Sequence, residues 1–458
     1  MNNFFERLLV GSWNRLRGQD RGARNEGKGV EIGRRVSDGE VTRERVVLTS
    51  AERTRHIAIL GKTGSGKSSL LRSMLAQDVE ADRGFACFDL HGEFLPFLLG
   101  TINARERRLR KHLDEKLVIV DPTDPIMSVG LNPLEQVSPD FTKIAEFSEV
   151  LRTRWALDHF GARTDELLRN ALFALSASGL TLVELAPFLT HAGFRAACLK
   201  QVANAEVRQY FEFRYEAQSE AMRATMREPI LNKTSAFTGI DAFRHVVGQA
   251  KSSFSVKEAM DSGQWVIVNL DKGKLGPQAL TLGSLFFTAF KNALFTRERR
   301  TLFSLVVDEA HNLLAADTGI DTVLAESRKW GIGLILSQQL MAQQSAETRD
   351  LLAGVGTQVY FQLSSPDAQQ ASAVLDGGRP LVERLKNLPQ RHCIVKSGAE
   401  RFVEVRVHGV EDPAADYADL LNRSRYTRGR VRAHIERDIA KRQELLRQKP
   451  DEVLHDWE

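Results

Sequence analysis

The stretch that most constrains the fold is a strand-like run that leads into a glycine-rich loop and then into a helical pattern. The loop follows residues 56–60 and consists of Gly61, Lys62, Thr63, Gly64, Ser65, Gly66, Lys67, Ser68 and Ser69. Its glycines let the backbone wrap around a phosphate, and the following helix adds its positive N-terminal end. In this pattern Lys67 reaches the β- and γ-phosphates of ATP, and the Ser68 hydroxyl ligates Mg²⁺. The alternative is a glycine-rich turn that binds no nucleotide.

A second strand supplies the acids that such a loop needs for hydrolysis. Residues 303–307 predict a buried strand, and Asp308 and Glu309 follow at its tip. ATP hydrolysis also needs an acid near the metal and a group that acts on the attacking water. We expect Asp308 to hold the water shell of Mg²⁺ and Glu309 to polarise the nucleophilic water. A purely structural pair of acids is the alternative.

Two further polar candidates follow the acid-tipped strand. The next strand ends in Ser337, Gln338 and Gln339. A buried strand rarely ends in two amides without a partner for them, so Gln338 is a candidate to contact the γ-phosphate or the water. Arg328, between the two strands, is a candidate to act on the γ-phosphate held by a neighbouring subunit. A surface amide pair and a solvated helix-end cation are the respective alternatives.

The spacing of apolar residues predicts an α/β fold with a mostly parallel sheet, interrupted by an inserted all-α domain and followed by a helical tail. The long separation between Lys67 and Asp308 supports the insertion, because a few strand–helix units need far less chain. We predict five segments: an N-terminal helix and linker (1–29), the first part of the α/β domain (30–136), the inserted helical domain (137–255), the second part of the α/β domain (256–410) and a charged helical tail (411–458).

Composition places the chain among ordinary globular proteins. Of its 458 residues 42% are hydrophobic and 27% are charged, which is typical of a soluble protein. No apolar run of about eighteen residues predicts a transmembrane helix, and the first ten residues are too short and too charged for a secretory signal. The three cysteines are far apart in apolar surroundings. We therefore expect reduced core cysteines and a cytoplasmic protein.

Arginine is concentrated in residues 14–55 and 423–437, although the net charge is only +4. Such clusters are typical either of a solvated or subunit-contact face or of nucleic-acid contacts, and the sequence leaves both open.

Taken together, these motifs resemble the HerA–FtsK superfamily of DNA-pumping ATPases, and within it the coupling proteins of conjugation and type IV secretion and the HerA-like translocases. The resemblance is carried by residues 61–68, 88–93, 131–134, 268–276, 307–311, 327–331 and 336–339. It implies a RecA-like P-loop core, a ring-shaped homo-hexamer and DNA passing through its centre. Lys67 and Ser68 match the Walker A residues, and Asp308 and Glu309 match the Walker B pair. Gln338 matches the sensor glutamine, and Arg328 the arginine that acts in trans.

The leading hypothesis is therefore an ATP-driven DNA translocase. Lys272 and Lys274, in the loop after a strand, are candidate contacts to DNA phosphates, because a motor must step along any sequence; solvated loop lysines are the alternative. A second hypothesis is a nucleotide-gated assembly platform that recruits a nuclease, relaxase or secreted protein without pumping DNA. A third is a metabolic P-loop kinase, against which the acid pair and the length of the chain argue. The sequence predicts no transmembrane helices of the kind with which coupling proteins usually begin, and residues 30–50 offer too little chain for the small β-barrel with which HerA usually begins. Conjugation, secretion, defence and repair all remain open as roles.

Overall fold

The computed structural model describes most of the chain, including the predicted nucleotide loop. The described residues are 29–135, 141–157, 159, 161–314, 320–339, 346–398, 401–414 and 416–444. The N-terminal helix and linker predicted for residues 1–29 lie outside these ranges except for the last residue.

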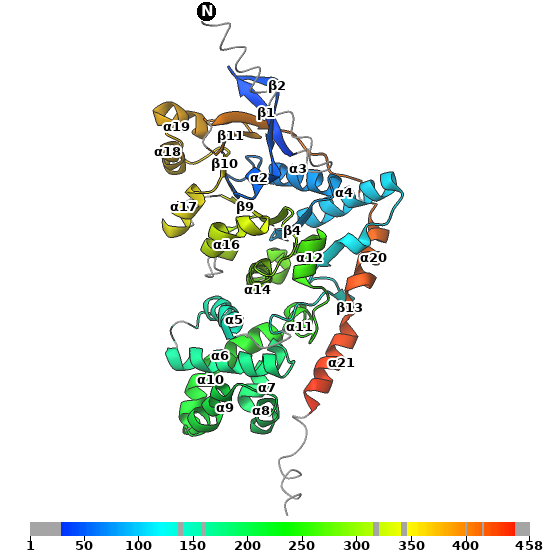
Figure 1. Ribbon diagram of the computed structural model, residues 1–458, viewed down its shortest axis with the longest axis vertical. Helices are drawn as coiled ribbons and strands as arrows, with labels where there is room; N and C mark the ends of the chain where they lie inside the picture. The colour runs from blue at the N-terminus through cyan, green and yellow to red at the C-terminus, as the bar shows by residue number, and fades with distance from the viewer. Residues whose placement is uncertain are drawn as a thin grey trace, which may run out of the picture.

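An eleven-stranded sheet forms the upper part of the molecule as drawn in Figure 1. Its order is β2-β1-β12-β11-β10-β3-β9-β8-β4-β7-β5. Every pair from β10 to β5 is parallel, and these seven strands are β10 (Thr357–Tyr360), β3 (Ile57–Leu60), β9 (Ile332–Gln338), β8 (Phe303–Val307), β4 (Gly84–Asp89), β7 (Trp265–Asn269) and β5 (Leu117–Val120). All of their residues are buried, as expected where helices cover both faces. The predicted α/β fold with a mostly parallel sheet is confirmed.

The two ends of the α/β part of the chain complete one edge of this sheet. Strands β1 (Val30–Ser37), β2 (Glu40–Leu48), β11 (His392–Ser397) and β12 (Val403–Val407) extend it in antiparallel fashion. Since β1 pairs with β12, residues near the start of the described chain close the sheet together with residues some 370 positions later.

Side chains of the central strands alternate between two cores. Ile57 and Ile59 of β3 pack with α3 (Lys67–Glu80) and α4 (Phe94–Leu109), whereas Ala58 and Leu60 belong to the opposite core, which includes α14 (Pro277–Leu294). The remaining helices of this part are α2 (Ser50–Arg53), η1 (Asp114–Lys116), α13 (Lys272–Leu275), α15 (His311–Leu314), α16 (Ile320–Glu326), η5 (Ser327–Trp330), α17 (Ala346–Ala353), α18 (Ser365–Val374) and α19 (Gly378–Lys386).

Helices fill the chain between β6 (Met127–Ser128) and β7, and most of them gather below the sheet in Figure 1. They are α5 (Phe141–Arg154), α6 (Ala162–Ala177), η3 (Leu182–Glu184), α7 (Leu185–Thr190), α8 (Ala192–Leu199), α9 (Ala205–Gln209), the π-helix η4 (Tyr210–Tyr215), α10 (Glu220–Thr238), α11 (Asp241–Val247) and α12 (Val256–Ser262). Their apolar side chains form one continuous cluster with those of one sheet face. The boundaries of the inserted domain at residues 137 and 255 stay predictions. Helix α12, which follows residue 255, packs on α14 beside the sheet.

The C-terminal segment runs as a strap along one side of the molecule, from the sheet down to the helical group (Figure 1). It comprises α20 (Ala418–Arg428), which packs against the edge strand β5, then β13 (Arg430–Val431), which pairs with β6, and α21 (Arg432–Arg442). From α21, Glu436 accepts a hydrogen bond from Arg244 at 2.9 Å, and Arg442 donates to the carbonyl of Gly248 at 2.6 Å. The strap therefore joins the sheet to the inserted helices.

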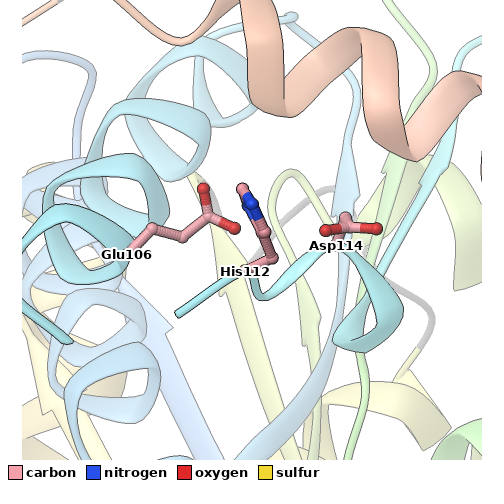
Figure 2. A group of neighbouring side chains, drawn as sticks. All are labelled: Glu106, His112 and Asp114. Carbon is pink, nitrogen blue, oxygen red and sulfur yellow. The ribbon is translucent and has the colours of Figure 1, made fainter. Parts of the chain in front are cut away.

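Most arginines of the 423–437 cluster are used within the chain. Arg423 donates to Glu106 at 2.6 Å and to Asp114 at 3.2 Å, and these two acids with His112 form the group drawn in Figure 2. Their ligand atoms lie within 4.8 Å of one another, as a metal site would require. However, the Arg423 guanidinium already supplies the positive charge, so we assign the group to an ion-pair network that holds α20 in place.

Candidate functional site

The glycine-rich loop occupies the carboxyl end of β3, as the sequence predicts. Gly64 and Gly66 have φ of 74° and 119°, which L side chains rarely adopt, and a Cβ on Gly66 would lie 3.0 Å from the Cα of Arg391. Helix α3 then begins at Lys67, and no side chain among the described residues caps it. Its first backbone N–H groups are therefore available to an anion such as a nucleotide phosphate.

Lys67 is 6% exposed and lies folded over its own loop. Its Nζ donates to the carbonyl of Gly61 at 2.7 Å and to that of Lys62 at 3.2 Å. Burial lowers the pKa of this amine, while the nearby carboxylates of Glu309 and Asp308 raise it. The acid pair and the lysine are thus brought to one place from distant parts of the sequence.

Asp308 and Glu309 follow β8, and each is 6% exposed. Burial raises the pKa of Asp308, and the backbone N–H of Glu309, which donates to Asp308 Oδ1 at 3.1 Å, opposes this shift. Glu309 has φ of 49°, an uncommon value for a residue other than glycine, and this local strain is typical of functional positions. Beside its carboxylate, the Nδ1 atom of His311 lies 3.4 Å from Glu309 Oε2.

Gln339 links the loop to the acid pair. Its Nε2 donates to Glu309 Oε1 at 2.7 Å, and its Oε1 accepts a hydrogen bond from the Thr63 hydroxyl at 3.1 Å. Gln338, by contrast, is 1% exposed and lines a small separate cavity with residues that include Arg349 and Tyr360. Successive residues of a strand point to opposite faces, so only one amide of the pair faces the loop. The sequence offered no way to choose between them, and the role of Gln338 stays a prediction.

Another acid at a strand end has a different use. Asp89, at the tip of β4, is fully buried and accepts hydrogen bonds from the backbone N–H groups of residues 91–95. Because those groups belong to the turn before α4 and to its first residues, Asp89 stabilises the entry into that helix.

Arg328 lies at the other end of the parallel strands. It belongs to η5, directly before the amino end of β9, and lines a surface pocket with Arg55 and His56, which precede β3. Its side chain is exposed and makes no hydrogen bond or ion pair with any residue in the described part of the chain. The chain therefore separates Arg328 from its own nucleotide loop by the length of the sheet strands.

Lys272 and Lys274 are on α13, which follows the carboxyl end of β7, and both are exposed. Lys274 forms an ion pair with Asp271 at 3.1 Å, and the Lys272 Nζ lies 3.4 Å from the side-chain oxygen of Asn312. Asn312 lies three residues after Glu309, so Lys272 is close to the segment that carries the acid pair. DNA contact by either residue stays a prediction.

Comparison with protein families decides the relationship. The family described as the type IV secretion-system coupling protein DNA-binding domain matches residues 42–392, which is most of the chain. The chain belongs to this coupling-protein family.

Known relatives of this coupling-protein family member agree with the assignment. The DNA double-strand break repair helicase HerA of Sulfurisphaera tokodaii is 23% identical over 435 residues, which cover 86% of this chain and 75% of HerA. The plasmid coupling protein TrwB, solved with ADP and Mg²⁺, covers 86% of this chain and 98% of its own at 16% identity, with a TM-score of 0.61. VirB4 of Thermoanaerobacter pseudethanolicus covers 84% and 98% at 16% identity, with a TM-score of 0.55. The two solved structures show the fold, and the predicted membership of the HerA–FtsK superfamily is confirmed.

Among the residues that the structure describes, none of the helices has both the length and the apolar composition of a membrane-spanning segment.

Proposed function

We propose that the chain is an ATP-hydrolysing ring motor that translocates DNA. The observation that carries the proposal is the cluster of Lys67, Asp308, Glu309 and Gln339 at the carboxyl ends of β3, β8 and β9, next to an uncapped helix N-terminus. Membership of the coupling-protein family and similarity to HerA support DNA as the partner.

ATP and Mg²⁺ fit this cluster. The glycine loop and the free N–H groups of α3 suit the phosphates, and Ser68 with Asp308 offers the oxygen ligands that Mg²⁺ prefers. When bound, Mg²⁺ neutralises charge on the phosphates. Lys67 would exchange its carbonyl partners for the β- and γ-phosphates, and Glu309 would act on the attacking water.

Gln339 adds a role that the sequence pattern had given to Gln338. With one end on Thr63 of the loop and the other on Glu309, it is placed to orient the water or to report the presence of the γ-phosphate. We propose Gln339 for this role.

Arg328 is proposed to act in trans in a homo-hexamer. It lies at the amino ends of the strands, away from its own loop, and its guanidinium has no partner in the described chain. A planar, permanently charged group suits the charge that develops on a transferred phosphoryl group.

DNA binding is proposed to rest on phosphate contacts, with Lys272 and Lys274 as candidates. Loss of both charges should weaken binding to duplexes of any sequence and reduce the slope of log affinity against log salt by about two. The double variant Lys272→Ala/Lys274→Ala is compared with Lys386→Ala, a lysine on α19 that pairs with Glu383. An unchanged salt slope in the double variant would remove these lysines from the proposal.

An ATPase assay with and without DNA tests the motor itself. A translocase should hydrolyse ATP several times faster with duplex or single-stranded DNA. A platform that recruits a nuclease, relaxase or secretion component should bind ATP and hydrolyse it at the same rate in both conditions, and that result would overturn the motor.

A further inference from the structure

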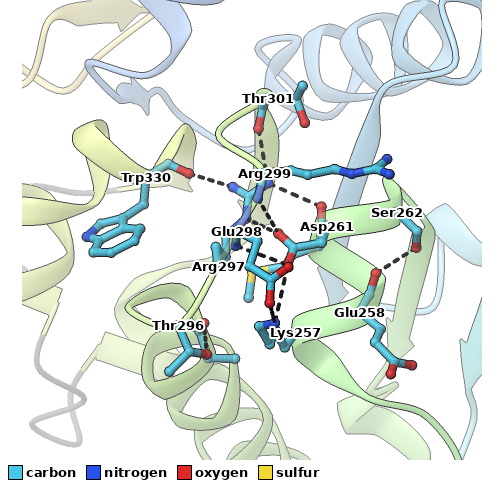
Figure 3. Close-up of polar contacts among 12 residues, drawn as sticks. Lys257, Glu258, Asp261, Ser262, Thr296, Arg297, Glu298, Arg299, Thr301 and Trp330 are labelled. Carbon is cyan, nitrogen blue, oxygen red and sulfur yellow. Dashed lines mark hydrogen bonds and ion pairs between the residues drawn. The ribbon is translucent and has the colours of Figure 1, made fainter.

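The buried side chain of Arg297 clamps three separate segments (Figure 3). It is 3% exposed and lies just beyond the end of α14. Its guanidinium donates to the backbone carbonyls of Trp330 at 2.7 Å, Thr301 at 3.1 Å and Met260 at 3.2 Å. The Asp261 carboxylate lies 3.4 Å from its Nε atom and balances its charge.

One of these bonds fixes the turn that carries Arg328. Trp330 is two residues beyond Arg328 in η5, and the turn closes when the N–H of Gly331 donates to the carbonyl of Arg328 at 3.1 Å. Gly331 has φ of 72°, and a Cβ there would lie 2.2 Å from the carbonyl oxygen of Arg300. The Arg300 guanidinium also lies 5.3 Å from the centre of the Trp330 ring.

The fixed turn contrasts with the free side chain that it carries. Arg328 is exposed and unpaired within the described chain, whereas the backbone on its C-terminal side is held by the buried core of its own subunit. A group that must meet a phosphate on another subunit needs such a rigid base, because small displacements of a catalytic group cost much of its effect.

The chemistry of Arg297 suits a residue that binds several backbone carbonyls better than one that only fills space in the core. Burying a guanidinium is costly, and an apolar side chain would fill the same space without that cost. The planar guanidinium carries five N–H donors spread over three nitrogen atoms, and it reaches three carbonyls from different segments. A lysine offers its donors from one nitrogen atom and cannot reproduce this arrangement.

We infer that Arg297 is a positioning residue for the trans-acting Arg328, holding η5 so that the arginine is presented to the neighbouring subunit. The inference rests on the proposed action of Arg328 across the subunit boundary.

Mixed rings test this, because they separate the subunit that supplies the arginine from the one that hydrolyses ATP. A Lys67→Ala subunit serves as donor, since it retains Arg328 but has an impaired site. An Arg328→Ala subunit serves as acceptor, since its site is intact but it supplies no arginine. Arg297→Lys is then introduced into the donor alone or into the acceptor alone, and Arg299→Lys, at an exposed neighbouring arginine, is the matched control.

Arg297→Lys in the donor should lower kcat of the mixed ring at least tenfold and leave KM for ATP unchanged, because the acceptor's pocket is untouched. The same change in the acceptor should alter kcat less than twofold. Equal losses on both sides would show a general structural role and overturn the inference, as would no loss on the donor side.

Two further measurements keep the test decisive. If Arg297→Lys does not fold, Arg300→Leu removes only the surface cation over Trp330 and should give a smaller loss, about threefold, again confined to the donor side. The mixture without any change at Arg297 is the reference. If that reference shows no hydrolysis, the trans action of Arg328 fails and the inference falls with it; if it hydrolyses ATP without a donor-side effect, only the inference falls.

Discussion

The two ends of the parallel strands differ in how completely the chain satisfies its own polar groups. At the carboxyl ends, Lys67 is held by carbonyls of its own loop, and Gln339 joins Glu309 to that loop. At the amino ends, Arg328 stands exposed on a rigid turn without a partner in the described chain. The comparison teaches that the chain satisfies its polar groups at one end of the sheet and leaves a charged side chain unpaired at the other, where we propose that another subunit is contacted.

The largest expected effect is the loss of ATP turnover when either end of the strands is disabled, and it can be tested by placing the two changes in different subunits. Arg328→Ala alone should lower ATP turnover about 10³-fold, the effect of an arginine supplied in trans, and Lys67→Ala alone should also be nearly inactive. Rings mixed from the two should regain part of the hydrolysis, measured as phosphate release, because an intact loop can take the arginine from a Lys67→Ala neighbour. Absence of recovery in verified mixed rings would place Arg328 outside catalysis or within its own subunit.

The next effect distinguishes binding from chemistry at the carboxyl ends. Glu309→Gln should retain ATP affinity and lower kcat by about 10² or more, because it removes only the group that acts on water. Lys67→Ala should weaken nucleotide binding itself. A fluorescent ATP analogue and a turnover assay measure the two properties, and turnover of Glu309→Gln at the parent rate would contradict the assigned roles.

A smaller effect should distinguish Gln338, the last residue of β9, from Gln339, which directly follows the strand. Gln339→Ala removes the link between Thr63 and Glu309 and should lower kcat about tenfold, as expected for loss of one orienting contact. Gln338→Ala is the matched control. A larger kcat loss in the Gln338 variant, with the folded structure retained, would return the sensor role to that residue.

The last predicted effect concerns the stability of the amino ends rather than turnover. His56 is buried, and burial lowers its pKa from 6.5 to about 4. Its Nδ1 accepts a hydrogen bond from the Leu334 N–H, so the folded protein holds the neutral ring. The stability from this group is therefore present above pH 6.5 and is lost as pH falls from 6.5 to about 4, by about 3 kcal/mol.

Denaturant unfolding of the parent and of His56→Gln measures that loss. The parent should lose more stability than the variant over this range, because the variant carries no titrating ring. Parallel pH profiles for the two proteins would show that His56 does not hold the amino ends in this way.

Much of the fold was predictable because its signals are local. The positions of Gly64 and Gly66 follow from backbone angles that few residues other than glycine adopt. The run 303–307, apolar except for Ser304, predicts a buried strand whatever lies beside it. The same locality explains why the loop, the acid pair and the helical insertion were found from the sequence.

The use of individual polar side chains was not predictable in the same way. Asp89 could have faced a nucleotide, but the start of α4 folds back over it and its oxygens bind backbone N–H groups. Arg423 could have contacted nucleic acid, but α20 packs on β5 and brings it to Glu106 and Asp114. In each case the partner comes from another element or another part of the chain.

By itself, the sequence determined that this chain has a phosphate-binding loop, an acid-tipped strand and a parallel sheet, because glycine geometry and apolar periodicity act within a few residues. Only the tertiary structure decided that Gln339 rather than Gln338 meets Glu309, and that Arg328 and the nucleotide loop occupy opposite ends of the strands. The reason is physical: the face to which a strand residue points and the end at which a turn lies depend on register and crossover connections between distant segments.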